Sequence, residues 1–314
     1  MKILIVSSRN SGKIAPFIQE QGDALSRSGV TIAYFPIIGK GIWGYLKNRK
    51  RLLSVLSDFQ PDLIHAHYGL SGLLANMQRS VPVITTYHGS DINDKRIYLF
   101  SKLNMFLSAH NIFVSEKNRK RSGQTTRQSL IPCGVNTDLF IIKDQAGARK
   151  SLNLELNKKY ILFSGAFANP VKNFLLANAA VFLLEDVKLI ELVAYTREEV
   201  ALLLNAVDVM LMTSLSEGSP QIIKEAMACN CPIVSVPVGD VEDVIGDTSG
   251  CLISTYEPTD IAAKLRQVLQ SGKRTEGRNR VLTLGLDGDT IASKIQDIYK
   301  RLITDKQSHR GSWM

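Results

Sequence analysis

The chain has 314 residues, of which 45% are hydrophobic and 21% charged, and this size is typical of one large or two ordinary globular domains. It has no apolar run near the roughly 18 residues of a membrane-spanning helix, its first apolar stretch is too short for a secretory signal, and its four cysteines are spaced too irregularly for a disulfide framework, so we expect a cytoplasmic protein. The net charge of +9 lies in the first half, since residues 1–150 hold 21 Lys and Arg against 9 Asp and Glu, and such a surface could face anionic lipid, nucleic acid or a phosphorylated substrate.

Short apolar runs alternate with stretches of helical periodicity along the first half of the chain. This βαβ rhythm predicts a parallel sheet with helices on both faces. Ligands of such sheets lie beyond the carboxyl ends of the strands, so the loops that follow the strands are candidate sites. The expected strands are Ile3–Val6, Val30–Phe35, Leu63–His67, Val83–Thr86 and Ile112–Val114.

The loop Ser7–Lys13 joins the first strand to the first helix. Gly12 would let the backbone approach a ligand closely, so Ser11, Gly12 and Lys13 are candidate residues for an acceptor site. An ordinary connecting turn is the alternative.

The stretch Gly39–Gly44 has the glycine spacing of a dinucleotide-binding loop. The acidic residue expected about 20 positions later should end the next strand, but Asp62 opens that strand and His67 ends it, so we disfavour an oxidoreductase. The following stretch, Trp43–Leu53, interleaves basic residues with aromatic and apolar ones. It would fit the headgroup layer of a membrane, or it is a solvated helix that packs on the sheet.

Histidines mark the ends of two neighbouring strands. His65 and His67 lie on one face of a strand and could bind a metal ion, but no nearby Cys, Asp or Glu completes a ligand shell, so we expect a structural or cleft-lining role. His88 and Asp91 lie in the turn after the strand Val83–Thr86 and therefore at the same edge of the sheet. An Asx-type turn closed by Asp91 is the plain alternative.

A second domain is expected to open near Ser151 and to repeat the same rhythm. Its first strand, Tyr160–Gly165, leads into a loop that ends at Lys172 and Asn173. Further strands are expected at Val187–Leu192, Val207–Met212, Pro232–Val236 and Gly250–Ile253.

The segment after Val207–Met212 predicts a phosphate site. Ser219 is the expected N-cap of a helix that continues from Pro220. The start of a helix offers unpaired backbone N–H groups and a partial positive charge, which together attract a phosphate. Glu217 and Glu225 flank this start, and because a phosphate repels carboxylates, we expect them to accept hydrogen bonds from sugar and ribose hydroxyls. A solvated helix with surface glutamates is the alternative.

The run from Glu217 to Ser235 reads Glu-Gly-Ser-Pro, then Glu-Ala-Met-Ala, then Cys-Asn-Cys-Pro-Ile-Val-Ser, and it resembles the retaining GT-B glycosyltransferases of family 4. The turn His88–Asp91 is similar to a second landmark of that family. The resemblance implies an α/β GT-B fold, in which two Rossmann-like domains with parallel sheets face a central cleft. Residues 1–150, with a returning helix at 290–304, would form the acceptor domain, and residues 151–289 the nucleotide-sugar domain.

The resemblance also implies roles for single residues. His88, Glu217 and Lys172 are the expected catalytic group: His88 and Glu217 hold donor-sugar hydroxyls, and Lys172 neutralises the leaving diphosphate. Asp91 would brace its turn or meet the acceptor. Ala166 stands where an arginine is usual, so one cationic contact has to come from elsewhere. The expected donor-binding residues are Gly218, Ser219, Pro220, Glu225 on the ribose, Gly165 and Asn173.

The predicted activity is transfer of a hexose from a nucleotide-diphosphate sugar to a glycan or polyprenyl-diphosphate-linked acceptor, in the synthesis of cell-surface polysaccharide. No cofactor, metal ion or nucleic acid is expected, and the basic first domain could contact the inner face of an anionic membrane. Two alternatives remain: a GT-B protein that binds carbohydrate without turnover, and a GT-B epimerase or phosphorylase of sugar nucleotides.

Overall fold

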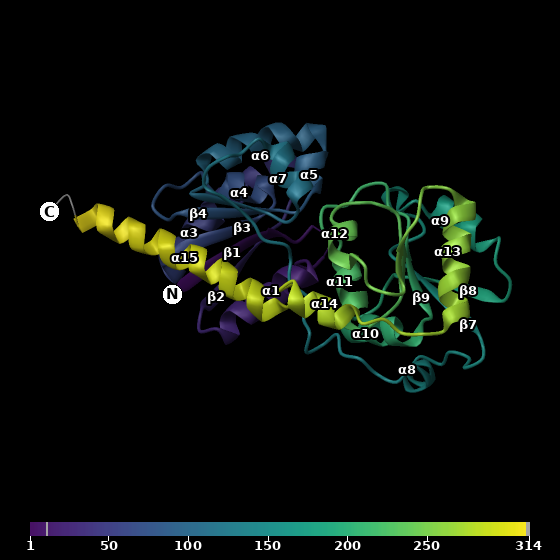
Figure 1. The fold of residues 1–314 in the computed structure, drawn as a ribbon. Helices are drawn as coiled ribbons and strands as arrows, with labels where there is room; N and C mark the ends of the chain where they lie inside the picture. The colour runs from purple at the N-terminus through teal and green to yellow at the C-terminus, as the bar shows by residue number, and fades with distance from the viewer. Residues whose placement is uncertain (11, 312–314) are drawn as a thin grey trace. The chain divides into compact units, whose positions relative to one another are not determined.

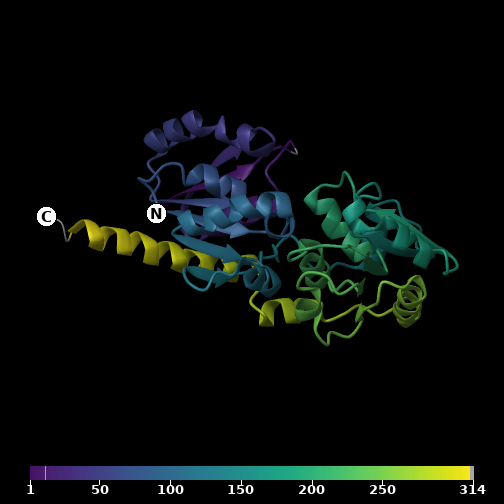
Figure 2. The same cartoon turned by 90° about the horizontal axis from the view of Figure 1, so that it is seen from above.

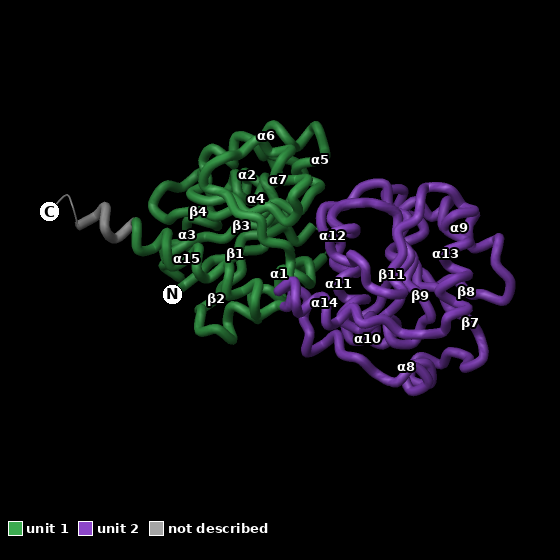
Figure 3. The backbone as a smooth tube through the Cα atoms, in the orientation of Figure 1, with its two compact units in different colours: residues 1–134, 288–314 green, residues 135–287 purple. Residues whose placement is uncertain are grey.

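The computed structural model describes residues 1–10 and 12–311, with only the backbone of residues 306–311. The chain divides into two compact units (Figure 3). Unit 1 comprises Met1–Gly134 together with the C-terminal segment from Gly288, and unit 2 comprises Val135–Asp287. Each unit contains a parallel sheet with helices, so the predicted α/β class is confirmed.

Unit 1 is built on a six-stranded sheet of order β2-β1-β3-β4-β5-β6, in which all neighbours are parallel. Its centre is apolar because strands covered by helices on both faces have no solvent side. In β1, the residues Ile3–Val6 are fully buried. The strands are β1 Lys2–Ser8, β2 Thr31–Ile37, β3 Leu63–His67, β4 Val83–Tyr87, β5 His110–Phe113 and β6 Gln128–Leu130.

The helices of unit 1 connect these strands, except for the last one. That helix, α15, packs against α1 through an apolar cluster that includes Ile295 and Tyr299, and it runs along unit 1 in both views (Figures 1 and 2). It contains the stretch 290–304 of the expected returning helix. The helices are α1 Pro16–Arg27, α2 Gly41–Leu46, α3 Arg49–Phe59, α4 Gly69–Ala75, α5 Ser90–Asn93, α6 Lys95–Leu107, α7 Glu116–Ser122 and α15 Gly288–Gly311.

Unit 2 is built on a five-stranded parallel sheet of order β11-β10-β9-β7-β8. Its strands are β7 Lys159–Phe163, β8 Val187–Glu191, β9 Val209–Met212, β10 Ile233–Ser235 and β11 Cys251–Ile253. Its helices are α8 Gln145–Ser151, a 3₁₀ turn at Pro170–Lys172, α9 Phe174–Val181, α10 Arg197–Ala206, α11 Gln221–Ala228, α12 Val241–Ile245, α13 Pro258–Ser271 and α14 Gly277–Thr283.

The division between the units falls at Gly134, earlier than the boundary expected at residue 150. Residues after Gly134 pack on unit 2: α8 lies against α10, and the buried Arg149 forms a 2.8 Å ion pair with Asp208. Val135 also forms a bridge with Asp287, where the chain leaves unit 2. The apolar and turn signals around residue 150 mark the start of β7 rather than the start of the unit.

Candidate functional site

The loop between β9 and α11 carries the predicted phosphate site. Pro220, not Ser219, is the N-cap of α11, so the predicted cap is wrong by one residue, and no side chain caps the helix. The hydroxyl of Ser219 is instead held 2.6 Å from Lys224 Nζ and 2.5 Å from Asp240 Oδ2. The start of α11 therefore has no side-chain cap at Pro220, and the start of a helix is where backbone N–H groups can bind an anion.

Lys224 is a buried cation beside this loop that sequence reasoning missed. Its side chain is fully buried, and the oxygen Oδ1 of the nearby Asp240 is buried without a hydrogen-bond partner. Burial raises the pKa of Asp240, against the opposing effects of Lys224 and Ser219. The residues Ile222–Ala228 of α11 are all buried in the structure, but the sequence of the helix, which includes Gln221, Lys224 and Glu225, gave no signal that its lysine would be buried.

Four predicted donor residues meet beside β7 and β9. Lys172 Nζ lies 2.7 Å from Glu217 Oε1, and both side chains are about four-fifths buried. The stem of Lys172 packs over Gly165, where an added Cβ would lie 2.8 Å from Lys172 Cγ. The hydroxyl of Thr213 donates to the carbonyls of Lys172 and Asn173 at 2.9 and 3.0 Å and so fixes the loop. A diphosphate would therefore compete with Glu217 for the Lys172 ammonium.

Glu225 is paired in a way that the sequence did not show. It is 2% exposed, and its Oε1 accepts a 2.6 Å hydrogen bond from Arg197. Arg197 opens α10, whose start is fixed by a reciprocal capping box between Thr196 and Glu199, and its guanidinium lies over the ring of Phe140 at 4.8 Å. Arg197 and Glu225 lie on different helices, so sequence spacing gave no sign of the contact.

In unit 1, Asp91 braces two loops at the carboxyl edge of the sheet. Its carboxylate accepts backbone hydrogen bonds from His88 at 3.1 Å, Gly89 at 3.0 Å and Gly69 at 3.1 Å. Gly89 has φ 115°, a conformation that favours glycine. Burial raises the pKa of Asp91 to about 6 even though the three N–H groups lower it. Of the two predicted roles, the structure shows the bracing one.

His88 ends a chain of buried imidazoles. Its Nε2 lies 3.0 Å from His67 Nδ1, its Nδ1 lies 3.5 Å from Cys133 Sγ, and the rings of His67 and His65 stack at 4.6 Å. His65 uses both nitrogens, with Tyr299 at 2.5 Å and Thr86 at 2.7 Å. The geometry therefore favours the structural reading of His65 and His67, and across residues 1–10 and 12–311 no group of three His, Cys, Asp or Glu could hold a metal ion.

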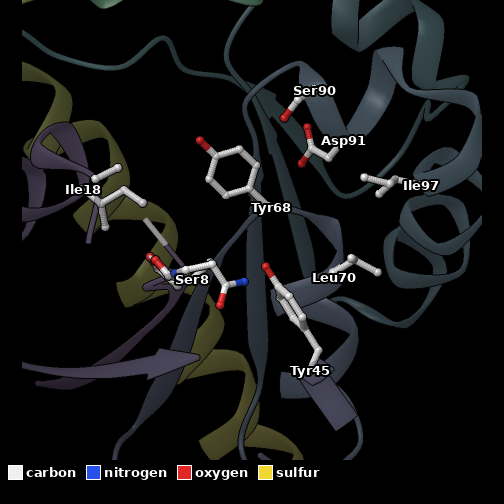
Figure 4. A pocket seen from close by; sticks show the side chains of 11 residues that line it. Ser8, Ile18, Tyr45, Tyr68, Leu70, Ser90, Asp91 and Ile97 are labelled. Atoms are coloured by element: carbon white, nitrogen blue, oxygen red, sulfur yellow. The ribbon is translucent and has the colours of Figure 1, made fainter. Parts of the chain in front are cut away.

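A cavity of about 380 Å³ lies at the same edge of unit 1 (Figure 4). The rings of Tyr45 and Tyr68 face it, and Tyr68 holds φ 72°, which is uncommon for an aromatic residue and marks a constrained position. Asp91 is part of its lining. The lining residues are Ser7, Ser8, Asn10, Ala15, Ile18, Tyr45, Tyr68, Leu70, Ser90, Asp91 and Ile97.

The other predicted acceptor residues follow Asn10 in the same loop. Gly12 and Lys13 are exposed, and Ser11 lies outside the described residues. Gly12 has φ 92°, and its carbonyl accepts a 2.9 Å hydrogen bond from Arg9. The backbone freedom attributed to Gly12 is therefore used to close this loop on itself.

The glycine run Gly39–Gly44 forms a tight backbone contact. An added Cβ at Gly39 would lie 2.7 Å from the carbonyl oxygen of Gly44, and Asn10 exchanges two hydrogen bonds with the backbone of Gly39. Further on, α3 buries Leu52 and Leu56, whereas Trp43 is 76% exposed. Within the described ranges, no helix is both long and apolar enough to cross a bilayer.

Two protein families match this chain. The family described as Glycosyltransferase Family 4 matches residues 10–139, which include His88 and Asp91. The family described as Glycosyl transferases group 1 matches residues 172–271, which include Glu217 and Glu225. The matched residues therefore include candidate residues of both units, although Gly165 lies outside them.

Named relatives agree with these families. Over 228 residues the chain is 26% identical to TuaC of Bacillus subtilis, named as a candidate glycosyltransferase of teichuronic acid biosynthesis, with 62% of this chain and 58% of TuaC covered. Over 267 residues it is 26% identical to a D-inositol 3-phosphate glycosyltransferase of Geodermatophilus obscurus, with 66% and 59% covered. The chain thus spans less than two thirds of either relative.

Solved structures share the fold over nearly the whole chain. A sucrose-phosphate synthase of Thermosynechococcus elongatus has a TM-score of 0.82 at 19% identity and covers 97% of this chain and 100% of its own. The Anabaena protein HepE, solved in complex with UDP-glucose, has a TM-score of 0.74 at 15% identity and covers 96% and 100%. At these identities the likeness concerns the fold.

Proposed function

This chain belongs to the group 1, family 4 glycosyltransferases, and from that premise we propose that it is a retaining enzyme that transfers a hexose from a nucleotide-diphosphate sugar to a glycan or lipid-linked acceptor. The predicted GT-B fold is confirmed by the two parallel sheets and by the solved structures. One observation carries the proposal: Gly165, Lys172 and Glu217, assigned to a donor site from two separate loops, meet in unit 2.

Charge stabilisation of the leaving diphosphate is the main chemical task of the proposed donor site. The acceptor oxygen bonds to the anomeric carbon on the face from which the diphosphate departs, the bond between that carbon and the phosphate oxygen breaks, and the acceptor proton passes to the departing phosphate. Lys172 and the first turn of α11 supply positive charge. Once the diphosphate engages Lys172, Glu217 is released to accept from sugar hydroxyls. We propose no cofactor or metal in this step.

The remaining residues position the substrates. We propose that Glu225, which Arg197 holds in place, binds the ribose hydroxyls, and that His88, which His67 holds, binds a hydroxyl of the donor sugar. HepE was solved with UDP-glucose, which supports a nucleotide sugar as the class of donor. The cavity of unit 1 takes the acceptor, because two tyrosine rings and the hydroxyls of Ser8 and Ser90 are groups that bind a sugar ring.

Synthesis of cell-surface polysaccharide at the inner membrane face is the proposed setting. A polyprenyl-diphosphate acceptor is anionic, and unit 1 holds 23 Lys and Arg against 10 Asp and Glu. Basic surfaces of this kind attract anionic lipid. Equal transfer rates to neutral soluble acceptors and to lipid-linked ones would contradict this setting.

The donor assignment is tested first by melting shifts with UDP-, GDP-, ADP- and dTDP-sugars, since a ligand of the native state raises apparent stability. We then expect Lys172→Ala to lower kcat by about 100-fold, because a developing charge loses its cation. Lys188→Ala, an exposed lysine of β8 in the same unit, is the matched control. Donor binding without transfer to any acceptor would instead indicate a carbohydrate-binding protein. Release of nucleotide diphosphate only when an acceptor is supplied would exclude an epimerase or phosphorylase.

A further inference from the structure

One helix of unit 1 carries three of its large apolar residues on the outside. Leu99, Leu103 and Phe106 of α6 are 71%, 51% and 73% exposed. Their spacing of four and three residues places them in one stripe along the helix. With Lys95, Arg96 and Lys102, which are also exposed, they form what we call the α6 face.

The buried side of α6 is largely polar. The Ser101 hydroxyl donates to the Asp91 carbonyl at 2.8 Å, and the Asn104 amide donates to Thr85 and Tyr87 at 3.0 and 2.8 Å. The helix α4 approaches α6 closely because it has glycines at the contact. An added Cβ at Gly72 would lie 2.2 Å from Asn104 Nδ2. Packing within unit 1 therefore does not account for the outward leucines and phenylalanine.

The charges around the stripe indicate what covers it. Lys95, Arg96 and Lys102 interrupt the apolar residues, and no acidic residue lies between Lys95 and Leu107. Unit 1 as a whole has a formal charge of +13, from 23 basic and 10 acidic residues. An apolar stripe with basic flanks matches the boundary between the headgroups and acyl chains of an anionic bilayer, where the apolar side chains insert and the cations meet lipid phosphates.

We propose that the α6 face docks unit 1 on an anionic membrane. This deepens the proposed membrane contact and adds a second surface to the stretch Trp43–Leu53, in which Leu52 is buried and Trp43 is 76% exposed. Docking would also bring the cavity beside the lipid surface, because Ile97 of the same helix lines the cavity (Figure 4). This consequence rests on the proposed function, in which the cavity takes a lipid-linked acceptor.

The test is flotation of the full chain with vesicles of phosphatidylcholine, with or without phosphatidylglycerol. We expect binding to the anionic vesicles to fall at least about 10-fold in the triple variant L99Q/L103Q/F106Q, because burial of three apolar side chains is lost. We expect it to fall roughly 100-fold in K95E/R96E/K102E, because each basic residue near an anionic surface adds to affinity. The matched control is L175Q/F182Q on α9 of unit 2, where the side chains are 80% and 87% exposed; it should bind like wild type.

A nucleotide melting shift and transfer to a soluble acceptor, measured on the same variants, separate this proposal from the proposed function. Both should stay at wild-type values if the α6 face only docks the protein. Unchanged vesicle binding in the triple apolar variant would overturn the proposal, as would an equal loss in the α9 control. Loss of self-association, with vesicle binding intact, would show that a second copy of the chain covers the face.

Discussion

The contact between His67 and His88 determines which ring nitrogen of His88 carries the proton. Burial, and then the neighbouring His65 and His88, hold the pKa of His67 well below its usual value, so its imidazole is neutral. Its Nε2 is buried without a hydrogen-bond partner, and an unpartnered acceptor costs less than an unpartnered N–H. We therefore place the proton of His67 on Nδ1, donating to Nε2 of His88. The proton of a neutral His88 is then on Nδ1.

If this orientation matters for transfer, loss of the donor at His67 should reduce turnover more than binding. We expect His67→Phe to lower kcat by about 10-fold with little change in the KM for the donor, since a hydrogen bond worth about 1.4 kcal/mol is lost. His67→Gln retains a side-chain donor and should recover part of the rate. The control is His110→Gln, because His110 is also buried in unit 1 but contacts Ser129. An equal loss in both phenylalanine and glutamine variants would contradict the orientation.

Single residues of the site could be predicted, but their partners could not. Lys172 was assigned from the resemblance to the family, and Glu217 from its place beside a helix start together with that resemblance. The contact of Arg197 with Glu225 depends on how α10 and α11 pack, which no local pattern encodes. The contact of Lys224 with Ser219, five residues before it, was also missed because the sequence gave no sign that Lys224 is buried. The partner of Lys172 also affects its proposed role, because Glu217 already neutralises the ammonium in this structure and a diphosphate would have to displace it.

At the level of elements, the strands were the most predictable part of the chain. The strand Leu63–His67 is observed with the predicted bounds, and all five of its residues, including His65 and His67, are buried. The three-residue edge strand β6 was missed, since it is too short to show a pattern. The outward apolar face of α6 could not be predicted, because helical periodicity assigns apolar residues to the core.

The close approach of α4 and α6 can be tested directly. We expect Gly72→Ala to lower the free energy of unfolding by about 1–3 kcal/mol, because the new methyl group overlaps Asn104 and Thr85 in a well-packed contact. Urea denaturation followed by circular dichroism measures the change. Gly147→Ala in α8 is the control, since the nearest atom to its added Cβ is 3.3 Å away and alanine favours the helix. Equal stability of the two variants would contradict this packing argument.

At the level of the whole molecule, the two units differ in their titratable groups. The protein has five histidines, and the side chains of four of them are described. These four lie in unit 1, whereas the sequence of unit 2 has no histidine. Burial lowers the pKa of His65 to about 3, and burial with Arg301 and Arg127 lowers that of His110 to about 4. The pKa of His67 is lowered in the same direction.

Unit 1 should therefore be the acid-sensitive part. A histidine with a lowered native pKa is neutral in both states above about pH 6.5 and costs no stability there. As the pH falls below that value, the unfolded state binds the proton first, so stability is lost until the native pKa is reached. At about pH 5, His65 and His110 each cost about 2 kcal/mol, and His67 adds to that loss. The raised pKa of Asp91 has the opposite sign and restores about 1 kcal/mol.

Proteolysis in urea at about pH 7 and about pH 5, with the fragments identified by mass spectrometry, measures this difference. We expect cleavage within residues 1–134 to begin at a lower urea concentration at the acid pH, while residues 135–287 change less. Equal shifts in both units would show that the buried histidines do not control acid stability.

The chain leaves unit 1 at Gly134 and returns to it at Gly288, and the returning helix supplies part of the apolar cluster that covers one face of the first sheet. During synthesis, the whole of unit 2 has therefore left the ribosome before Ile295 and Tyr299 are available to that sheet. Until then, the surface around Ile3, Leu63 and Ile112 has no final cover. A nascent chain stalled before Gly288 should consequently bind cellular chaperones through its earliest residues, although these were the first to be made.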